Sequence, residues 1–267
     1  MRNNKHGEWK QRLVAGAAGA SMLALMMVVG PGVAAQAPQG GRGGAPAGPP
    51  PTPQAGAAID LTGYWVSIVN EDWRWRMVTP PKGDFTSVPL NPAGQQVAKD
   101  WNPATDGSCL AFGAAGLMRM PTRLHITWAD PNTLKIETDN GEQTRLLHFG
   151  DRSAQTGAPS LQGYSVAEWI RTRGRGRGQP PPGGSLTVVT NNLSGGWLRR
   201  NGVPYSENAT VTEYFDRFPV PDSGEWMSVT TRVEDPKYLQ RPFVTSSHFR
   251  REPDGSKWHP APCKPVA

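Results

Sequence analysis

The sequence predicts an all-β fold, an antiparallel up-and-down barrel of the lipocalin-like kind, with a β-sandwich as the alternative. Ten short segments are rich in β-branched and aromatic residues, and several alternate apolar and polar residues. Turn residues separate them, and only 92–101 looks helical. Because no segment is long enough for the helix of a parallel crossover, neighbouring strands are expected to be antiparallel. Closure into a barrel would remove the exposed strand edges.

The expected strands follow one another with short turns between them. Asp130-Pro-Asn132 and Asp139-Asn-Gly141 are turn signals on either side of one strand. The segment 73–77 alternates Trp and Arg strictly, and 124–128 alternates as well. In chain order the expected strands are 59–69, 73–77, 124–128, 134–138, 144–149, 164–170, 185–191, 209–218, 226–233 and 243–250.

Residues 1–35 have the pattern of a signal peptide. A basic start is followed by an apolar stretch at 13–29 and by Val33-Ala-Ala35, a small-residue site that fits signal-peptidase cleavage. A retained membrane anchor is the alternative, but Gly30-Pro31 breaks the apolar stretch. We therefore expect a periplasmic or secreted protein with no integral membrane span after processing.

Two segments lack the large apolar residues that a packed core needs. Residues 36–58 are mostly Pro, Gly and Ala and are expected to be a disordered linker. Residues 171–184 carry four arginines and are expected to be a disordered loop within a single barrel domain, 59–267. The formal net charge of +6 falls to +3 without residues 1–35, and to −1 without those arginines as well. No nucleic-acid surface is therefore expected.

The chain has two cysteines, Cys109 and Cys263. An even number in an exported protein favours a disulfide, which would close a loop of about 154 residues and contribute about 5 kcal/mol of stability. Two free thiols, one of them a nucleophile, are the alternative. No His-containing signature surrounds either cysteine, so the disulfide is preferred.

Four motifs occur in the order Gly163-Tyr-Ser-Val-Ala-Glu-Trp169, Gly184-Ser-Leu-Thr-Val-Val-Thr190, Val211-Thr-Glu-Tyr-Phe215 and Glu234-Asp-Pro-Lys-Tyr-Leu-Gln-Arg-Pro242. Together they resemble a large family of uncharacterised exported proteins from environmental bacteria, over residues 105–250. Cys109 and Thr144-Arg145 fit the same pattern. The chain departs from it after Trp169, where the Arg/Gly/Pro insertion replaces the frequent Trp-Glu-Gly-Asp-Thr-Leu. The resemblance implies a compact β domain outside the cytoplasm and no particular activity.

Glu213 is the clearest anomaly among the expected strands. It shares a face with Val211 and Phe215, and this more apolar face should point into the barrel. A buried carboxylate needs a cation, and Arg145 is the expected partner. The pair is either a structural ion pair or a functional one. In the functional case Glu213 is a general acid/base assisted by Tyr214 or His148, or the pair anchors the polar end of an apolar ligand.

The tryptophans are the second feature that points to function. Nine of the ten lie outside residues 1–35. Indole rings offer flat apolar walls with one donor each, so several together can line a ligand cavity. Ordinary core packing is the alternative for any single ring. The tryptophans predicted to line the cavity are Trp65, Trp73, Trp75, Trp128 and Trp169.

We therefore predict an exported, monomeric barrel that binds a small apolar or aromatic molecule and has no cofactor. A cofactor-independent lyase, isomerase or cyclase using Glu213 is the first alternative, and an envelope structural or interaction protein is the second. Four histidines lie outside the signal peptide, but none occurs in H-x-H or H-E-x-x-H spacing, so no metal site is predicted.

Overall fold

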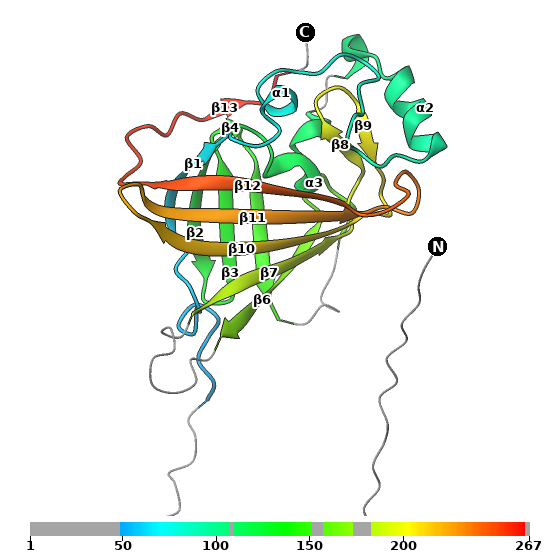
Figure 1. Cartoon of the computed structure of the whole chain (residues 1–267). Coiled ribbons are helices and arrows are strands. Elements are labelled where there is room, and N and C mark those ends of the chain that lie inside the picture. Colours follow the sequence, from blue (N-terminus) through cyan, green and yellow to red (C-terminus); the bar gives the residue numbers. More distant parts are fainter. Residues whose placement is uncertain (1–48, 107–108, 151–156, 173–182, 265–267) are drawn as a thin grey trace, which may run out of the picture. The chain divides into compact units, whose positions relative to one another are not determined.

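The computed structural model describes residues 49–106, 109–150, 157–172 and 183–264. Nine strands form a closed barrel, which confirms the predicted all-β barrel and rules out the β-sandwich (Figure 1). The expected signal peptide and most of the Arg/Gly/Pro loop fall outside the described residues. Around the ring the strands are β1 (Gly63–Ile68), β12 (Phe243–Glu252), β11 (Gly224–Glu234), β10 (Thr210–Val220), β7 (Gly183–Asn191), β6 (Tyr164–Thr172), β5 (Thr144–Phe149), β3 (Thr133–Thr138) and β2 (Arg123–Asp130).

One neighbouring pair of strands in the ring is parallel. β5 and β6 pair through Leu147↔Ser165, His148↔Val166 and Phe149↔Ala167, whereas the other eight neighbouring pairs are antiparallel. The barrel is therefore mixed, and the expected up-and-down, lipocalin-like connectivity is not confirmed. A parallel pair needs about a dozen connecting residues, and the chain between Phe149 and Tyr164 supplies that length without a predicted helix.

The segment 73–77 is the one expected strand that the structure contradicts. It forms the short helix α1 (Trp73–Arg76) instead. Arg76 is buried, donates from Nε to the carbonyl oxygen of Arg119 at 2.8 Å, and forms an ion pair with Glu71. Tertiary contacts of this one arginine therefore override the two-residue alternation of Trp and Arg.

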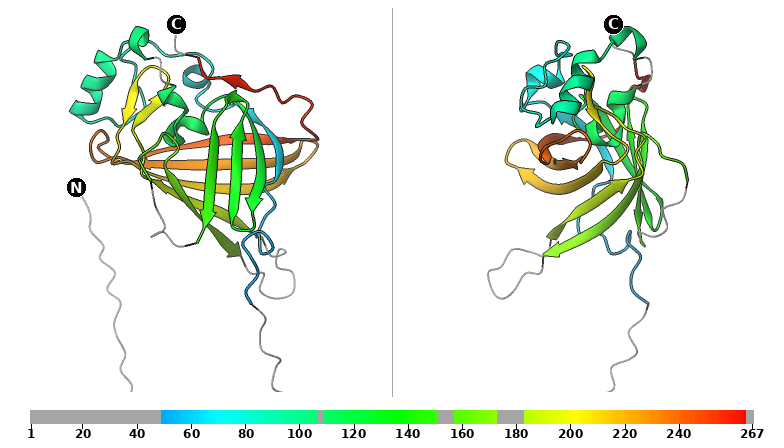
Figure 2. Two further views of the ribbon diagram at one scale, coloured as in Figure 1. Left: turned by 180° about the vertical axis from the view of Figure 1, so that it is seen from behind. Right: turned by 90° about the vertical axis from the view of Figure 1, so that its right-hand side faces the viewer.

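Several short elements cover one end of the barrel (Figures 1 and 2). The expected helix at 92–101 is present as α2 (Pro92–Asp100), where Pro92 occupies the first turn and the Asn91 side chain accepts a hydrogen bond from the Gly94 amide at 2.9 Å. Among the described residues, no helix is long and apolar enough to cross a membrane. The other covering elements are α3 (Ala114–Leu117), the 3₁₀ helices η1 (Pro103–Thr105) and η2 (Leu110–Phe112), and the hairpin of β8 (Gly196–Arg199) and β9 (Val203–Tyr205).

The interior of the barrel is packed with side chains from alternate positions of its strands. Trp65 from β1 is completely buried, as are Leu124 from β2 and Phe215 from β10. A second buried cluster joins the covering elements to the same end of the barrel, and it includes Val211 and Phe243 from the strands. The described interior is therefore a close-packed core, as expected for a small barrel.

Residues 49–58 belong to the described structure, although the composition assigns them to a linker. The Gln54 amide donates a hydrogen bond to the carbonyl oxygen of Pro131, at the turn between β2 and β3. The disordered linker expected at 36–58 is therefore too long at its C-terminal end. Composition misses this because the attachment uses backbone atoms rather than large apolar side chains.

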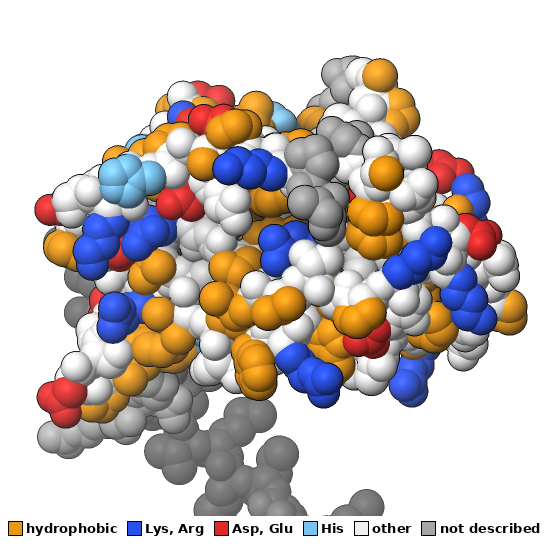
Figure 3. Space-filling view, turned by 90° about the horizontal axis from the view of Figure 1, so that it is seen from above, with side chains coloured by type: hydrophobic (Ala, Val, Ile, Leu, Met, Phe, Trp, Pro, Cys, Tyr) orange, Lys and Arg blue, Asp and Glu red, His pale blue; other side chains and the backbone are white. Residues whose placement is uncertain are grey.

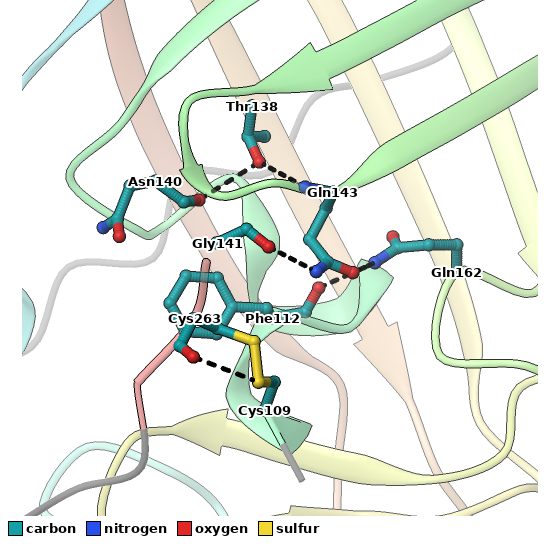
Figure 4. Close-up of a disulfide and its surroundings, with 8 residues drawn as sticks. All are labelled: Cys109, Phe112, Thr138, Asn140, Gly141, Gln143, Gln162 and Cys263. Carbon is teal, nitrogen blue, oxygen red and sulfur yellow. Dashed lines mark hydrogen bonds between the residues drawn. A yellow bond between two sulfur atoms is a disulfide. The ribbon is translucent and has the colours of Figure 1, made fainter. Parts of the chain in front are cut away.

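The predicted disulfide is present between Cys109 and Cys263 (Figure 4). Beside it, β13 (Ala261–Pro262) pairs in parallel with β4 (Asn140–Gly141). The Gln162 side-chain amide donates to the carbonyl oxygen of Phe112 at 2.8 Å and to Oε1 of Gln143 at 2.9 Å. The disulfide and these bonds fasten the C-terminal segment and η2 to the covered end of the barrel.

Gly141 of β4 allows the ring of Phe112 to pack closely against the backbone of that strand. Its φ is +88°, and a Cβ atom there would lie 2.3 Å from Cδ1 of Phe112. Gly224 has a similar φ of +79° but no heavy atom within 4 Å. We expect Gly141→Ala to lower the free energy of unfolding by about 2 kcal/mol more than Gly224→Ala, because both substitutions strain the backbone but only the first meets a ring. Denaturant unfolding of the two variants measures the difference, and equal losses would show that the Phe112 ring moves aside freely.

Candidate functional site

Arg145 and Glu213 meet inside the barrel as a two-point ion pair. Arg145 of β5 donates from Nη1 to Oε1 of Glu213 at 3.0 Å and from Nη2 to Oε2 at 2.7 Å. Its Nη2 also donates to the hydroxyls of Ser165 at 3.4 Å and Thr190 at 3.2 Å, which lie on the two strands between β5 and β10. The pairing expected from strand alternation is therefore found, with two hydroxyls completing its surroundings.

This buried pair is sealed from solvent. Both side chains have an exposed fraction of 0 %, and neither lines any of five pockets found among the described residues. Tyr214 and His148 lie on the outer face of their strands: Tyr214 is exposed, and the His148 ring stacks on that of Tyr164. A molecule touching either residue does not reach Glu213. The catalytic set predicted around Glu213 is not brought together, and the geometry favours a structural ion pair.

Three of the five predicted pocket tryptophans lie apart from the rest. Trp65 is buried in the core, where its Nε1 donates to the carbonyl oxygen of Leu61 at 2.9 Å. Trp73 is 61 % exposed on α1, and Trp75 on the same helix donates from Nε1 to Asp84 at 3.2 Å. The expected common cavity is therefore wrong for these three, because α1 lies outside the barrel ring and Trp65 is enclosed by core side chains.

Trp128 and Trp169 are brought together through Phe149. The ring centroids of Trp128 and Phe149 are 5.5 Å apart, and those of Phe149 and Trp169 are 5.4 Å apart. The interplanar angles of 32° and 31° are similar, so the three rings form a continuous tilted row, here called the aromatic row. It draws one ring each from β2, β5 and β6, on the inward face of the barrel.

A pocket of about 340 Å³, here called the edge pocket, lies beside the aromatic row. It forms where the pairing of β5 with β6 ends, at Phe149↔Ala167, while β6 continues to Thr172. Its walls come from the end of β5, from β6 and β7, and from the chain segment 51–53. Nε1 of Trp169 donates to the carbonyl oxygen of Pro53 at 2.9 Å and so holds that segment in place.

The rim of the edge pocket carries one charge of each sign. Glu168 and Arg171 both line it and both are exposed. The Arg171 guanidinium also donates to the carbonyl oxygen of Gly56. The pocket thus offers aromatic and aliphatic walls and two charged groups that can orient the polar end of a molecule.

A second pocket of about 380 Å³ lies between α2 and β8, and we call it the cap pocket. Nε1 of Trp101 and Nε1 of Trp197 both donate to Oδ2 of Asp106, at 2.8 and 2.9 Å. Sequence reasoning missed this pair of indoles as pocket residues. They are far apart in the chain, and no periodicity links them, so only the fold brings them together.

The histidines lie in separate places. The His125 ring stacks on Tyr64 with centroids 4.2 Å apart, and Nδ1 of His248 lies 3.1 Å from Glu71. His125 and His148 are on β2 and β5, with β3 between them. Within the described ranges, no group of three or more His, Cys, Asp or Glu side chains is placed to hold a metal ion.

The covered end of the barrel presents a mixed surface. In the view from above, hydrophobic side chains lie among separate Lys/Arg and Asp/Glu side chains (Figure 3). Trp73, Met77 and Val78 are exposed hydrophobic residues of α1 and the segment that follows it. On this face the described residues show no continuous basic patch.

Comparison of the chain with family models, curated proteins and solved structures gave no match. The resemblance to exported bacterial β proteins therefore stays a prediction. The aromatic row and the edge pocket are the features that bear most directly on function.

Proposed function

We propose that this protein is an exported barrel that binds a small apolar or aromatic molecule in the edge pocket. The observation that carries the proposal is the aromatic row, which leads from the barrel interior to a pocket of about 340 Å³. Pockets for small ligands typically measure about 300–1,000 Å³ and combine apolar and aromatic walls with a few polar groups. The edge pocket has both features.

The wall of the edge pocket is held in place before any ligand binds. The Trp169 indole is fixed at one end by its bond to Pro53 and along its face by Phe149, which in turn packs against Trp128. A fixed aromatic wall needs little ordering on binding, which favours affinity. A flat ring can stack on it at an offset or meet it edge-on.

The charged rim points to a ligand with one polar substituent. Glu168 accepts hydrogen bonds and Arg171 donates them, so either a donor or an acceptor on the ligand finds a partner there. The ring would then lie against Phe149 and Trp169, where burial contributes about 25 cal/mol per Å² of apolar surface. A small aromatic molecule with one polar group fits this arrangement best.

Export is proposed on two further features. Residues 1–35 have the signal-peptide pattern, and the disulfide between Cys109 and Cys263 is of a kind that persists in oxidising compartments. Mass spectrometry of the protein isolated from its host tests this directly. The expected mass is that of residues 36–267 less two hydrogens for the disulfide.

A fluorescent apolar probe tests binding in the edge pocket. N-phenylnaphthylamine is expected to bind residues 36–267 with a Kd of about 1–10 μM, and Trp169→Leu is expected to weaken it at least about tenfold through loss of the stacking wall. Trp197→Leu is the matched control, because it removes an indole from the cap pocket only. Fluorescence titration gives the Kd of each variant, and thermal unfolding checks that each is folded.

The titrations separate the two pockets. Loss of affinity in Trp169→Leu with unchanged affinity in Trp197→Leu supports the edge pocket. The opposite pattern moves binding to the cap pocket and contradicts the proposal, as does a wild-type protein that leaves the probe fluorescence unchanged.

A further inference from the structure

Four arginines from three separate segments meet at the covered end of the barrel. Arg76 belongs to α1, Arg119 follows α3, Arg199 is the last residue of β8, and Arg200 follows it. Together with Trp75 they line a small hollow, here called the arginine hollow. Its volume of about 10 Å³ is room for one water-sized group.

Arg199 is the unusual member of this group. It is 3 % exposed, and none of its three guanidinium nitrogens has a hydrogen-bond partner among the described residues. Its guanidinium carbon lies 4.8 Å from the ring centroid of Trp75. A cation–π contact of this kind does not replace the hydrogen bonds that a buried cation loses with water.

The other arginines are only partly neutralised. Arg76 pairs with Glu71, and Arg119 donates from Nη1 to Asp72 at 2.9 Å. Nη2 of Arg119 is buried and has no hydrogen-bond partner within the described segments. Donors on two neighbouring guanidiniums are thus left without acceptors.

Arg199 keeps its charge at neutral pH. Burial lowers its pKa to about 10, with a further lowering from the positive charge of Arg119, while Asp72 and Asp84 act in the opposite direction. Neither carboxylate is within ion-pair distance of Arg199, although both are close enough to affect it. The hollow is therefore a positively charged site with unused donors.

We propose that the arginine hollow binds a small oxyanion, a carboxylate or phosphate group, with one oxygen entering the hollow. The planar N–H groups of arginine match the oxygens of carboxylates and phosphates, and such charge-assisted hydrogen bonds are short and strong. An oxygen in the hollow accepts from Arg199 and from Nη2 of Arg119, the donors that the described protein leaves unpaired. The small volume admits one oxygen and leaves the rest of the anion outside.

Thermal unfolding at constant ionic strength tests the proposal on residues 36–267. With sodium chloride as the reference salt, about 10 mM sodium phosphate or sodium acetate is expected to raise Tm by about 3 °C, the shift for a Kd near 1 mM. Phosphate alone giving the shift identifies a phosphoryl ligand, and acetate alone identifies a carboxylate. No shift with either anion overturns the proposal.

Arg199→Met is expected to remove the anion-dependent shift, because it keeps an unbranched apolar side chain but removes the charge and all the N–H donors. Arg250→Met is the matched control, since Arg250 is exposed on β12 and should leave the shift unchanged. An equal shift in Arg199→Met overturns the proposal.

An NMR titration of the ¹⁵N-labelled wild type tests the same proposal without depending on whether a variant folds. Phosphate or acetate is expected to move at most a few arginine Nε–H resonances with a saturating curve. The proposal is overturned if these resonances stay fixed, or if all of them move together in proportion to the salt concentration.

Discussion

Replacing Glu213 with alanine is expected to lower the free energy of unfolding by about 3–5 kcal/mol. The substitution leaves the Arg145 guanidinium inside the barrel with no carboxylate, and the hydroxyls of Ser165 and Thr190 supply no negative charge. An uncompensated buried charge costs far more than the net value of the ion pair itself. Urea unfolding of the wild type and the variant measures the difference. Thermal unfolding is expected to show a fall in Tm of about 10 °C.

The double variant Arg145→Met/Glu213→Leu is the control for this prediction. It removes both charges and fills the space with apolar atoms, so it is expected to be more stable than Glu213→Ala. It is also expected to bind N-phenylnaphthylamine like the wild type, because the pair does not line the edge pocket. A Glu213→Ala protein as stable as the wild type contradicts the sealed ion pair, and a double variant that no longer binds the probe contradicts its structural role.

Replacing both cysteines with serine is expected to lower the free energy of unfolding by about 5 kcal/mol in the chain-entropy estimate. The disulfide joins residues 154 positions apart, so its loss frees a large loop in the unfolded chain. Denaturant unfolding of Cys109→Ser/Cys263→Ser against the oxidised wild type checks the value. Limited trypsin digestion at Lys257, next to the fastened C-terminal segment, gives an independent measure of local release.

The size of the loss in the free energy of unfolding distinguishes two roles for the disulfide. A loss near 5 kcal/mol means that the bond acts on the unfolded chain as a whole. A loss below about 1 kcal/mol, with rapid cleavage at Lys257, means that the C-terminal segment detaches while the barrel stays folded, and contradicts the prediction.

The barrel strands were predictable because their alternation is enforced by burial. On β10 and β11 every second side chain enters the core, so the pattern of apolar residues fixes the register. The same alternation predicts that the side chains of Glu213 and Arg145 point into the barrel, as they do. A carboxylate and a guanidinium that both point into one small apolar barrel are expected to pair with each other, because the interior offers few other charged partners.

The errors arose where tertiary contacts decided the local structure. Trp73 to Met77 alternates like a strand, but five residues also fit one turn of helix, and the contacts of Arg76 select the helix. The parallel pairing of β5 with β6 left no sign in the sequence, because the connection between them contains no predicted helix.

The candidate site was predictable only in part. Trp128 and Trp169 were both predicted to line one cavity with three other tryptophans, but only Trp169 lines the edge pocket. Neither Phe149, which lies between the two indoles, nor Pro53 was predicted as a site residue. The edge pocket depends on the unpredicted end of a parallel ladder and on a segment whose composition indicates disorder. Composition and alternation describe strands one at a time and do not show where two strands part.

The closure of the ring has a consequence for the order of folding. β1 hydrogen-bonds to β12, so the first and last strands of the barrel are neighbours although almost the whole folded part of the chain separates them (Figure 1). Contacts this distant in sequence form slowly, because the intervening loop loses much of its freedom before they are made. A chain that ends before Phe243 lacks the closing strand and leaves edges open on β1 and β11. The barrel therefore closes only once β12 is available to pair with both β1 and β11.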